Sequence, residues 1–60
     1  MTFRELEKLI KKDGWYLVNV EGSHHHYRHP SKKGKIQIPR HGGDLKKGLL
    51  NAILKQAGLK

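Results

Sequence analysis

Four of the five histidines in this 60-residue chain lie in one short segment, EGSHHHYRHP, which runs from Glu21 to Pro30. Imidazole titrates near neutral pH, binds transition metals and passes protons between other groups. The segment could therefore hold a metal ion, respond to pH or transfer a proton in a reaction. The other residues of the chain decide which of these uses is favoured.

A metal site is the first use to weigh. His24 and His26 are two residues apart, so on a strand their side chains would share one face and could bind zinc together. His29 or His41 could complete the set of ligands. However, the chain has no cysteine, few carboxylates lie nearby, and the spacing matches neither a zinc finger nor a zinc protease. The sequence therefore predicts neither a metal nor another cofactor.

The charge of the chain indicates the kind of partner. Thirteen Lys and Arg against five Asp and Glu give a formal net charge of +8. Positive residues recur along the whole chain, which favours nucleic acid over a basic domain whose charge serves only solubility. The absence of cysteine makes the cytoplasm the expected compartment. No apolar run approaches the roughly 20 residues that a membrane span needs, so no membrane partner is expected.

Proton transfer on RNA is a reaction that would use both the histidines and the positive charge of the chain. RNA carries its own nucleophile, the 2′-hydroxyl, beside the phosphate that it can attack. An enzyme then needs a base with a pKa near neutrality, and cations for the developing charge, which histidine, lysine and arginine supply. Neither a metal nor a deep pocket is required, which suits a chain that buries only about 60% of its unfolded surface. The alternative is that the histidines only contact phosphates or water.

The first element that must position these residues is a helix. Thr2 and Glu5 form a capping-box pattern at its start, and Asp13-Gly14 ends it. Its apolar residues recur at helical spacing along one face, namely Phe3, Leu6, Leu9 and Ile10.

Three short strands are predicted next, WYLVNV over 15–20, HHHYRH over 24–29 and KIQIP over 35–39, separated by turns. Alternation in the first strand would set Trp15 and Leu17 against Tyr16, Val18 and Val20. In the second strand, His24 and His26 would share one face, while His25 and Tyr27 share the other. A shift by one residue would exchange these faces, and the sequence alone does not determine the register.

A second helix closes the chain. Asp44 is the predicted N-cap, Gly58 ends the helix, and the predicted core residues on it are Leu49, Leu50 and Ile53. The order α-β-β-β-α with short connections predicts an α+β fold, in which a three-stranded antiparallel sheet carries both helices on one face. The histidines and some of the lysines are expected on the opposite face.

The run GSHHHYRHP, followed by KIQIPRHGGDLKKGLLNAILKQAGL, resembles the HicA toxins of bacterial and archaeal toxin–antitoxin systems. The resemblance covers nearly the whole chain, from the opening helix and DGW to the closing AILKQAGL, so that residues 1–60 would form a single HicA-like domain. Three fragments occur together in this family, namely Gly22-Ser23-His24, Pro39-Arg40-His41 and Lys47-Gly48. Their combination is specific for the family, although each fragment alone would be weak evidence.

The resemblance implies a fold similar to the double-stranded-RNA-binding domain and a metal-independent endoribonuclease that cleaves mRNA. It also implies a HicB-type antitoxin that blocks the active site, and contact with DNA only indirectly, through the antitoxin complex. The catalytic histidine of the family corresponds to His24, with His25 as second choice, and Gly22 and Ser23 would shape the turn that presents it.

Other residues are candidates for supporting roles. A second histidine could act as an acid, and the candidates for this role are His26, His29 and His41. Positive side chains could contact phosphates, and the candidates are Arg28, Lys32, Lys35, Arg40, Lys46 and Lys47. The competing interpretations are a non-catalytic RNA-binding module with a basic sheet face and a subunit that mainly docks on an acidic partner.

Overall fold

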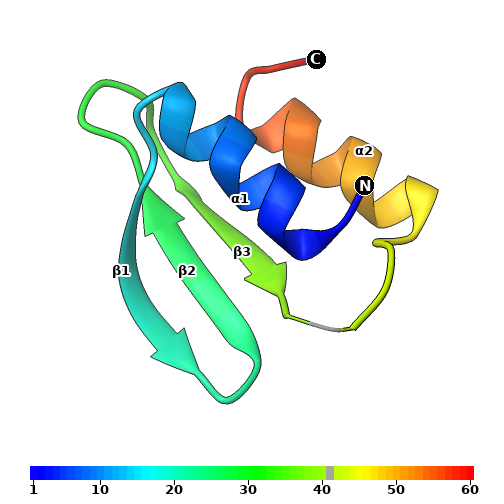
Figure 1. The fold of residues 1–60 in the computed structure, drawn as a ribbon. Coiled ribbons are helices and arrows are strands. Elements are labelled where there is room, and N and C mark those ends of the chain that lie inside the picture. The colour runs from blue at the N-terminus through cyan, green and yellow to red at the C-terminus, as the bar shows by residue number, and fades with distance from the viewer. Residues whose placement is uncertain (41) are drawn as a thin grey trace.

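The computed structural model describes residues 1–40 and 42–60, and it has the α-β-β-β-α order that the sequence predicts. The elements are α1 (Phe3–Lys12), β1 (Tyr16–Glu21), β2 (His24–Arg28), β3 (Lys35–Pro39) and α2 (Lys47–Gln56). The strands form one antiparallel sheet in the order β1-β2-β3. Both helices lie on the same side of this sheet (Figure 1). The predicted fold class is therefore confirmed.

The first helix begins where the capping box predicts. The hydroxyl of Thr2 accepts a hydrogen bond from the Glu5 amide at 3.2 Å, and the Glu5 carboxylate accepts one from the Thr2 amide at 2.8 Å. The chain leaves the helix through Gly14, whose φ of 112° disfavours any residue with a side chain. A Cβ at this glycine would lie 2.7 Å from Nε2 of His29, so the close approach of that ring also requires glycine here.

The hydrophobic core lies between the sheet and the two helices. Tyr27 of β2 pairs with Ile36 of β3, and His25 pairs with Ile38, so these side chains all point toward the helices. The core draws on α1, β2, β3, α2 and residues next to these elements. Its buried members are Phe3, Leu6, Ile10, Trp15, Tyr27, Ile36, Ile38, Leu45, Ile53 and Ala57.

β1 departs from the predicted alternation. Its register with β2 shifts between Leu17 and Asn19, so Val18 is a bulged residue. A bulge inserts one extra residue into a strand and reverses the alternation beyond it. Leu17 and Val20 therefore both point toward the helix side, opposite Tyr27 and His25 respectively. The prediction that Leu17 and Val20 lie on opposite sides is wrong beyond the bulge.

The strand boundaries differ slightly from those predicted. β1 begins one residue later than expected and continues through Glu21, and β2 ends at Arg28 rather than at His29. Trp15 is buried just before β1 begins. The turn between β1 and β2 is therefore reduced to Gly22 and Ser23.

The second helix starts later than predicted, and Asp44 does not cap it. Lys46 occupies the N-cap position, and its side chain makes no capping hydrogen bond. Asp44 instead forms an isolated antiparallel bridge with Thr2, and its Oδ1 lies 3.8 Å from the amino group of Met1. Pairing with the N-terminal segment holds this part of the chain extended, which delays the helix.

The later start also changes which residues of α2 are buried. Ile53 is 3% exposed, as predicted, and Leu50 packs partly buried against the core. Leu49, in contrast, is 39% exposed, so its assignment to the core is wrong. Leu45 is buried and lies four residues before Leu49, but it precedes the helix, so helical spacing does not place the two leucines on one face.

Candidate functional site

One side of the sheet is not covered by either helix (Figure 1). The residues on this side form three rows across the strands, namely Tyr16–Arg28–Lys35, Asn19–His26–Gln37 and Glu21–His24–Pro39. We call these residues the open face. His24 and His26 share it, as the strand alternation predicts, and His25 lies on the opposite side with Tyr27.

His24 occupies the first position of β2 and is exposed on the open face. Together with Glu21, His26 and Gln37 it lines a shallow pocket of about 290 Å³. The side-chain amide nitrogen of Gln37 donates a hydrogen bond to Nδ1 of His24. This contact leaves Nε2 as the ring nitrogen available to a bound molecule.

The turn before His24 consists of Gly22 and Ser23. Gly22 has a φ of 59°, which lies in the left-handed region that favours glycine. The backbone oxygen of Ser23 accepts a hydrogen bond from the Arg40 amide at 2.6 Å. The turn is thereby attached to the end of β3, which fixes the position from which the His24 side chain projects.

His26 lies on the open face but is only 7% exposed. Its Nε2 is 3.4 Å from Oε1 of Glu21, and neither ring nitrogen has a hydrogen-bond partner within residues 1–40 and 42–60. The flanking side chains of Asn19 and Gln37, which pair with His26 across the sheet, stand on either side of it. Only a small part of this imidazole is therefore accessible to a bound RNA.

His25 points into the helix-covered side of the sheet. Its ring lies 4.9 Å from the ring of Phe3 in an edge-to-face arrangement. Arg40 also lies over the Phe3 ring, with its guanidinium carbon 5.6 Å from the ring centroid. His25 therefore belongs to the packing between β2 and α1 and does not join the pocket around His24.

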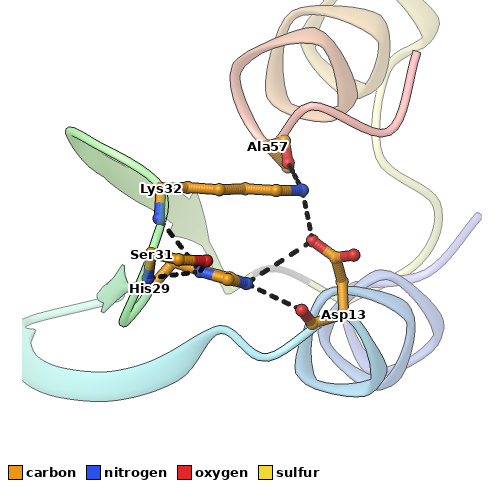
Figure 2. Close-up of polar contacts among 5 residues, drawn as sticks. All are labelled: Asp13, His29, Ser31, Lys32 and Ala57. Carbon is orange, nitrogen blue, oxygen red and sulfur yellow. Dashed lines mark hydrogen bonds and ion pairs between the residues drawn. The ribbon is translucent and has the colours of Figure 1, made fainter.

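His29 is held in a structural cluster that lies after β2 (Figure 2). Its Nδ1 accepts hydrogen bonds from the backbone amides of Ser31 and Lys32, both at 3.1 Å. Because Nδ1 is an acceptor, the ring proton sits on Nε2, which donates to the backbone oxygen of Asp13 at 2.7 Å. Both ring nitrogens are therefore occupied by contacts that join the β2–β3 loop to the end of α1.

Lys32 completes the same cluster (Figure 2). Its Nζ donates to Oδ2 of Asp13 at 2.5 Å and to the backbone oxygen of Ala57 at 2.9 Å. The hydrogen bond from Lys32 holds the pKa of the Asp13 carboxyl below its usual value. Lys32 thus connects both helices to the loop, and its ammonium group is already bound within the fold.

The remaining candidate phosphate contacts occupy three places. Arg28 and Lys35 are exposed neighbours at the far end of the open face, about 13 Å from His24 along β2 at roughly 3.3 Å per residue. Arg40 follows β3, where it lines a separate pocket with Arg4. Lys46 and Lys47 are exposed at the start of α2, in the helix layer. His41, the remaining candidate acid, lies outside the described residues.

Within residues 1–40 and 42–60, no group of three or more His, Cys, Asp or Glu side chains is arranged to hold a metal ion. Over the same residues, neither helix has the length and apolar character needed to span a bilayer.

Glu21 and Gln37 line the His24 pocket, and neither is among the site residues predicted from the sequence. Alternation in KIQIP places Gln37 on the face opposite Ile36 and Ile38, so the sequence could have predicted that Gln37 lies on the open face. Its proximity to His24, however, depends on the register between β2 and β3, which the sequence does not specify.

A comparison with protein families identifies the family of the chain. The family model described as the HicA toxin of bacterial toxin–antitoxin systems matches residues 3–59, which include all five structural elements. No curated protein sequence matches the chain. Because the match extends over nearly the whole sequence, the chain belongs to the HicA toxin family.

Proposed function

We propose that this protein is a toxin that acts as an endoribonuclease on mRNA in the cytoplasm. It would cleave RNA without a metal ion, and a HicB-type antitoxin would block it. Contact with DNA would occur only through the complex with the antitoxin. One observation carries the proposal: in a member of a toxin family, an exposed histidine stands in a pocket on an uncovered sheet face.

The proposed reaction uses the RNA's own 2′-hydroxyl as nucleophile. Nε2 of His24 takes the proton from this hydroxyl while its oxygen forms a bond to the adjacent phosphorus. The bond from phosphorus to the 5′-oxygen then breaks, and the departing oxygen takes a proton from solvent. The products are a 2′,3′-cyclic phosphate and a free 5′-hydroxyl, and His24 returns its proton to solvent. General base catalysis of this kind contributes about 10²–10⁴-fold to the rate.

We assign the proton transfer to His24 among the described histidines on grounds of access. The rings of His25 and His26 face the core or are covered by their neighbours, and His29 uses both ring nitrogens within the fold. His24 is exposed and lines a pocket.

Cationic side chains would supply the affinity for RNA. Arg28 and Lys35 extend the open face away from His24, and Arg40 is attached to its other end through the Ser23 backbone. Lys46 and Lys47 could hold RNA that continues past the sheet onto the helix layer. Lys32 is left out of this set because its ammonium binds Asp13 and Ala57.

An antitoxin that covers the open face would block the His24 pocket together with Arg28 and Lys35. The excess of positive charge, +8 in total, favours a partner that presents acidic side chains to this surface. The same face would then be contested by RNA and by the antitoxin.

The experiment that tests the function is cleavage of a long mRNA by the purified protein in EDTA. We expect wild type to cut, and His24→Ala to lose cutting by at least about 100-fold while it stays folded and still binds RNA. His25→Phe, which keeps an aromatic ring at the inner position, is the matched control and should cut like wild type.

Two outcomes would contradict the proposal. If folded wild type binds RNA with a strong dependence on salt but yields no products, the protein is a non-catalytic RNA-binding module. If His24→Ala cuts as fast as wild type, the reaction does not depend on this imidazole. Equal cleavage by wild type and His24→Ala would make His41 the next candidate for the proton transfer.

A further inference from the structure

Gln37 and His24 lie on neighbouring strands of the open face, and the two side chains meet there. Gln37 pairs directly with His26, while His24 pairs with Pro39 two residues further along β3. The long side chain of Gln37 therefore reaches diagonally along the sheet to Nδ1 of His24. Diagonal neighbours on antiparallel strands are within reach of such side chains.

We propose that Gln37 is a positioning residue for the reaction, which holds the His24 ring by Nδ1 so that Nε2 faces the RNA. This inference rests on the proposed ribonuclease function and deepens it. Gln37 does not contact the reacting atoms in this role. It acts through the orientation and tautomer of the imidazole.

An amide is suited to this task because it carries a donor and an acceptor on one planar group. In the structure, the amide nitrogen donates to an unprotonated Nδ1, which places the ring proton on Nε2. Rotation of the amide by half a turn presents its oxygen to Nδ1 instead. The oxygen accepts a proton from Nδ1, and this leaves Nε2 with the lone pair that a base requires. The same contact stabilises the ring after Nε2 has taken up its proton.

Among the groups near His24 in the described part of the chain, Gln37 is the one whose side chain contacts the imidazole ring. The titratable and charged groups near it are Glu21 on β1, His26 on its own strand and Arg40 beyond β3. Glu21 lies 3.4 Å from His26, and Arg40 stacks on Phe3. Among the described residues, the contact from Gln37 is the hydrogen bond that the structure records for the His24 ring.

Gln37 adds little to the packing of the fold, because its side chain is exposed while its neighbours Ile36 and Ile38 are buried. Substitution at this position should therefore leave the protein folded. A loss of activity on substitution can then be attributed to the His24 site and not to unfolding.

The test compares three variants by cleavage kinetics across pH. Gln37→Met has a similar length but offers no comparable hydrogen bond, and we expect kcat to fall about 10–100-fold with little change in KM. Gln37→Glu keeps an oxygen acceptor, so cleavage should persist. Its negative charge favours the protonated ring, so the pH–rate profile should move to higher pH by about one unit. Gln56→Met, an exposed glutamine at the end of α2, is the matched control and should match wild type.

A second readout does not depend on catalysis. The ¹⁵N chemical shifts of the His24 ring report its tautomer, and we expect the tautomer balance to differ between wild type and Gln37→Met. Unchanged shifts, or a kcat in Gln37→Met equal to that of the Gln56→Met control, would overturn the inference. A rise in KM alone would make Gln37 an RNA contact, which also contradicts it. Inactive wild type with the expected change in shifts would overturn the ribonuclease function and leave the positioning contact in place.

Discussion

The ring of His25 lies 4.9 Å from the ring of Phe3, edge to face, and connects β2 to α1. Its neighbour His24 points to the opposite side of the sheet, into the pocket that it shares with Gln37. Two adjacent histidines therefore have separate environments, one in the packing of the fold and one on the surface proposed for RNA.

The packing role of His25 predicts that two substitutions at this position differ in their effect on stability. His25→Ala removes the aromatic contact and should lower the free energy of unfolding by about 1–3 kcal/mol. His25→Phe keeps the contact and removes Nδ1, which is buried without a hydrogen-bond partner in the described structure. The free energy of unfolding of His25→Phe should therefore lie within about 1 kcal/mol of the wild-type value. Urea denaturation of the three proteins measures this, and equal stability of wild type and His25→Ala would contradict it.

The phenol of Tyr27 donates a hydrogen bond to the Glu7 carboxylate at 2.5 Å, between β2 and α1. Tyr27→Phe removes only this hydroxyl and should cost about 1–2 kcal/mol, since bonds to charged groups are among the stronger ones. The matched control is Tyr16→Phe, because Tyr16 is 49% exposed on the open face, and this change should cost under 0.5 kcal/mol, roughly the limit for surface substitutions. Similar losses in both variants would contradict the assignment.

Burial, together with the Glu7 carboxylate, raises the pKa of Tyr27 well above its ordinary value of 10.0. A raised pKa means that the folded state retains a proton which the unfolded state releases. The stabilisation from this group is therefore fully present below about pH 10 and is lost as the pH rises further. Denaturation at pH 9 and above should show that the difference between wild type and Tyr27→Phe shrinks with increasing pH. A difference that grows with pH would contradict this reasoning.

The Asp13 carboxyl has its pKa lowered from the usual 3.8, mainly by the hydrogen bond from Lys32. A lowered pKa gives stability that is present above the ordinary value and is lost as the pH falls through the folded-state value. Asp13→Asn should therefore lower Tm at pH 7, and the difference from wild type should fade as the pH falls below the ordinary value of 3.8. The control is Asp44→Asn, whose side chain is 76% exposed and should change Tm little. A loss in Asp13→Asn that is independent of pH would argue against the charge as its cause.

Leu49 and Ile53 lie about one turn apart on α2 but differ in burial, and this predicts a contrast between two truncations. Ile53 is 3% exposed and Leu49 is 39% exposed. Ile53→Ala should cost about 2–5 kcal/mol, which is a large part of the stability of so small a domain, whereas Leu49→Ala should cost less than about 1 kcal/mol. Thermal melts with both variants measure the contrast. A Leu49→Ala variant as unstable as Ile53→Ala would mean that Leu49 is buried in solution.

The sequence by itself determined the features that depend on neighbours in the chain. The capping box at Thr2 and Glu5, the apolar stripe of α1 and the alternation of Ile36 and Ile38 all arise within a few residues. Such patterns predict helices, strands and their order without knowledge of the partner elements. They also placed His24 and His26 on one face of β2, because alternation along a regular strand is a local property.

The tertiary structure decided whatever depends on which strands and loops meet. The bulge at Val18 reverses the alternation of side chains along β1. No pattern in WYLVNV predicts it, because a bulge depends on how the strand pairs with its neighbour. Several contacts join residues that lie 5 to 19 positions apart in the chain. They are the approach of Glu21 to His26, the contacts of Asp13 with His29 and Lys32, and the contact of Gln37 with His24. Their side chains meet only after the register of the sheet and the docking of the helices are set.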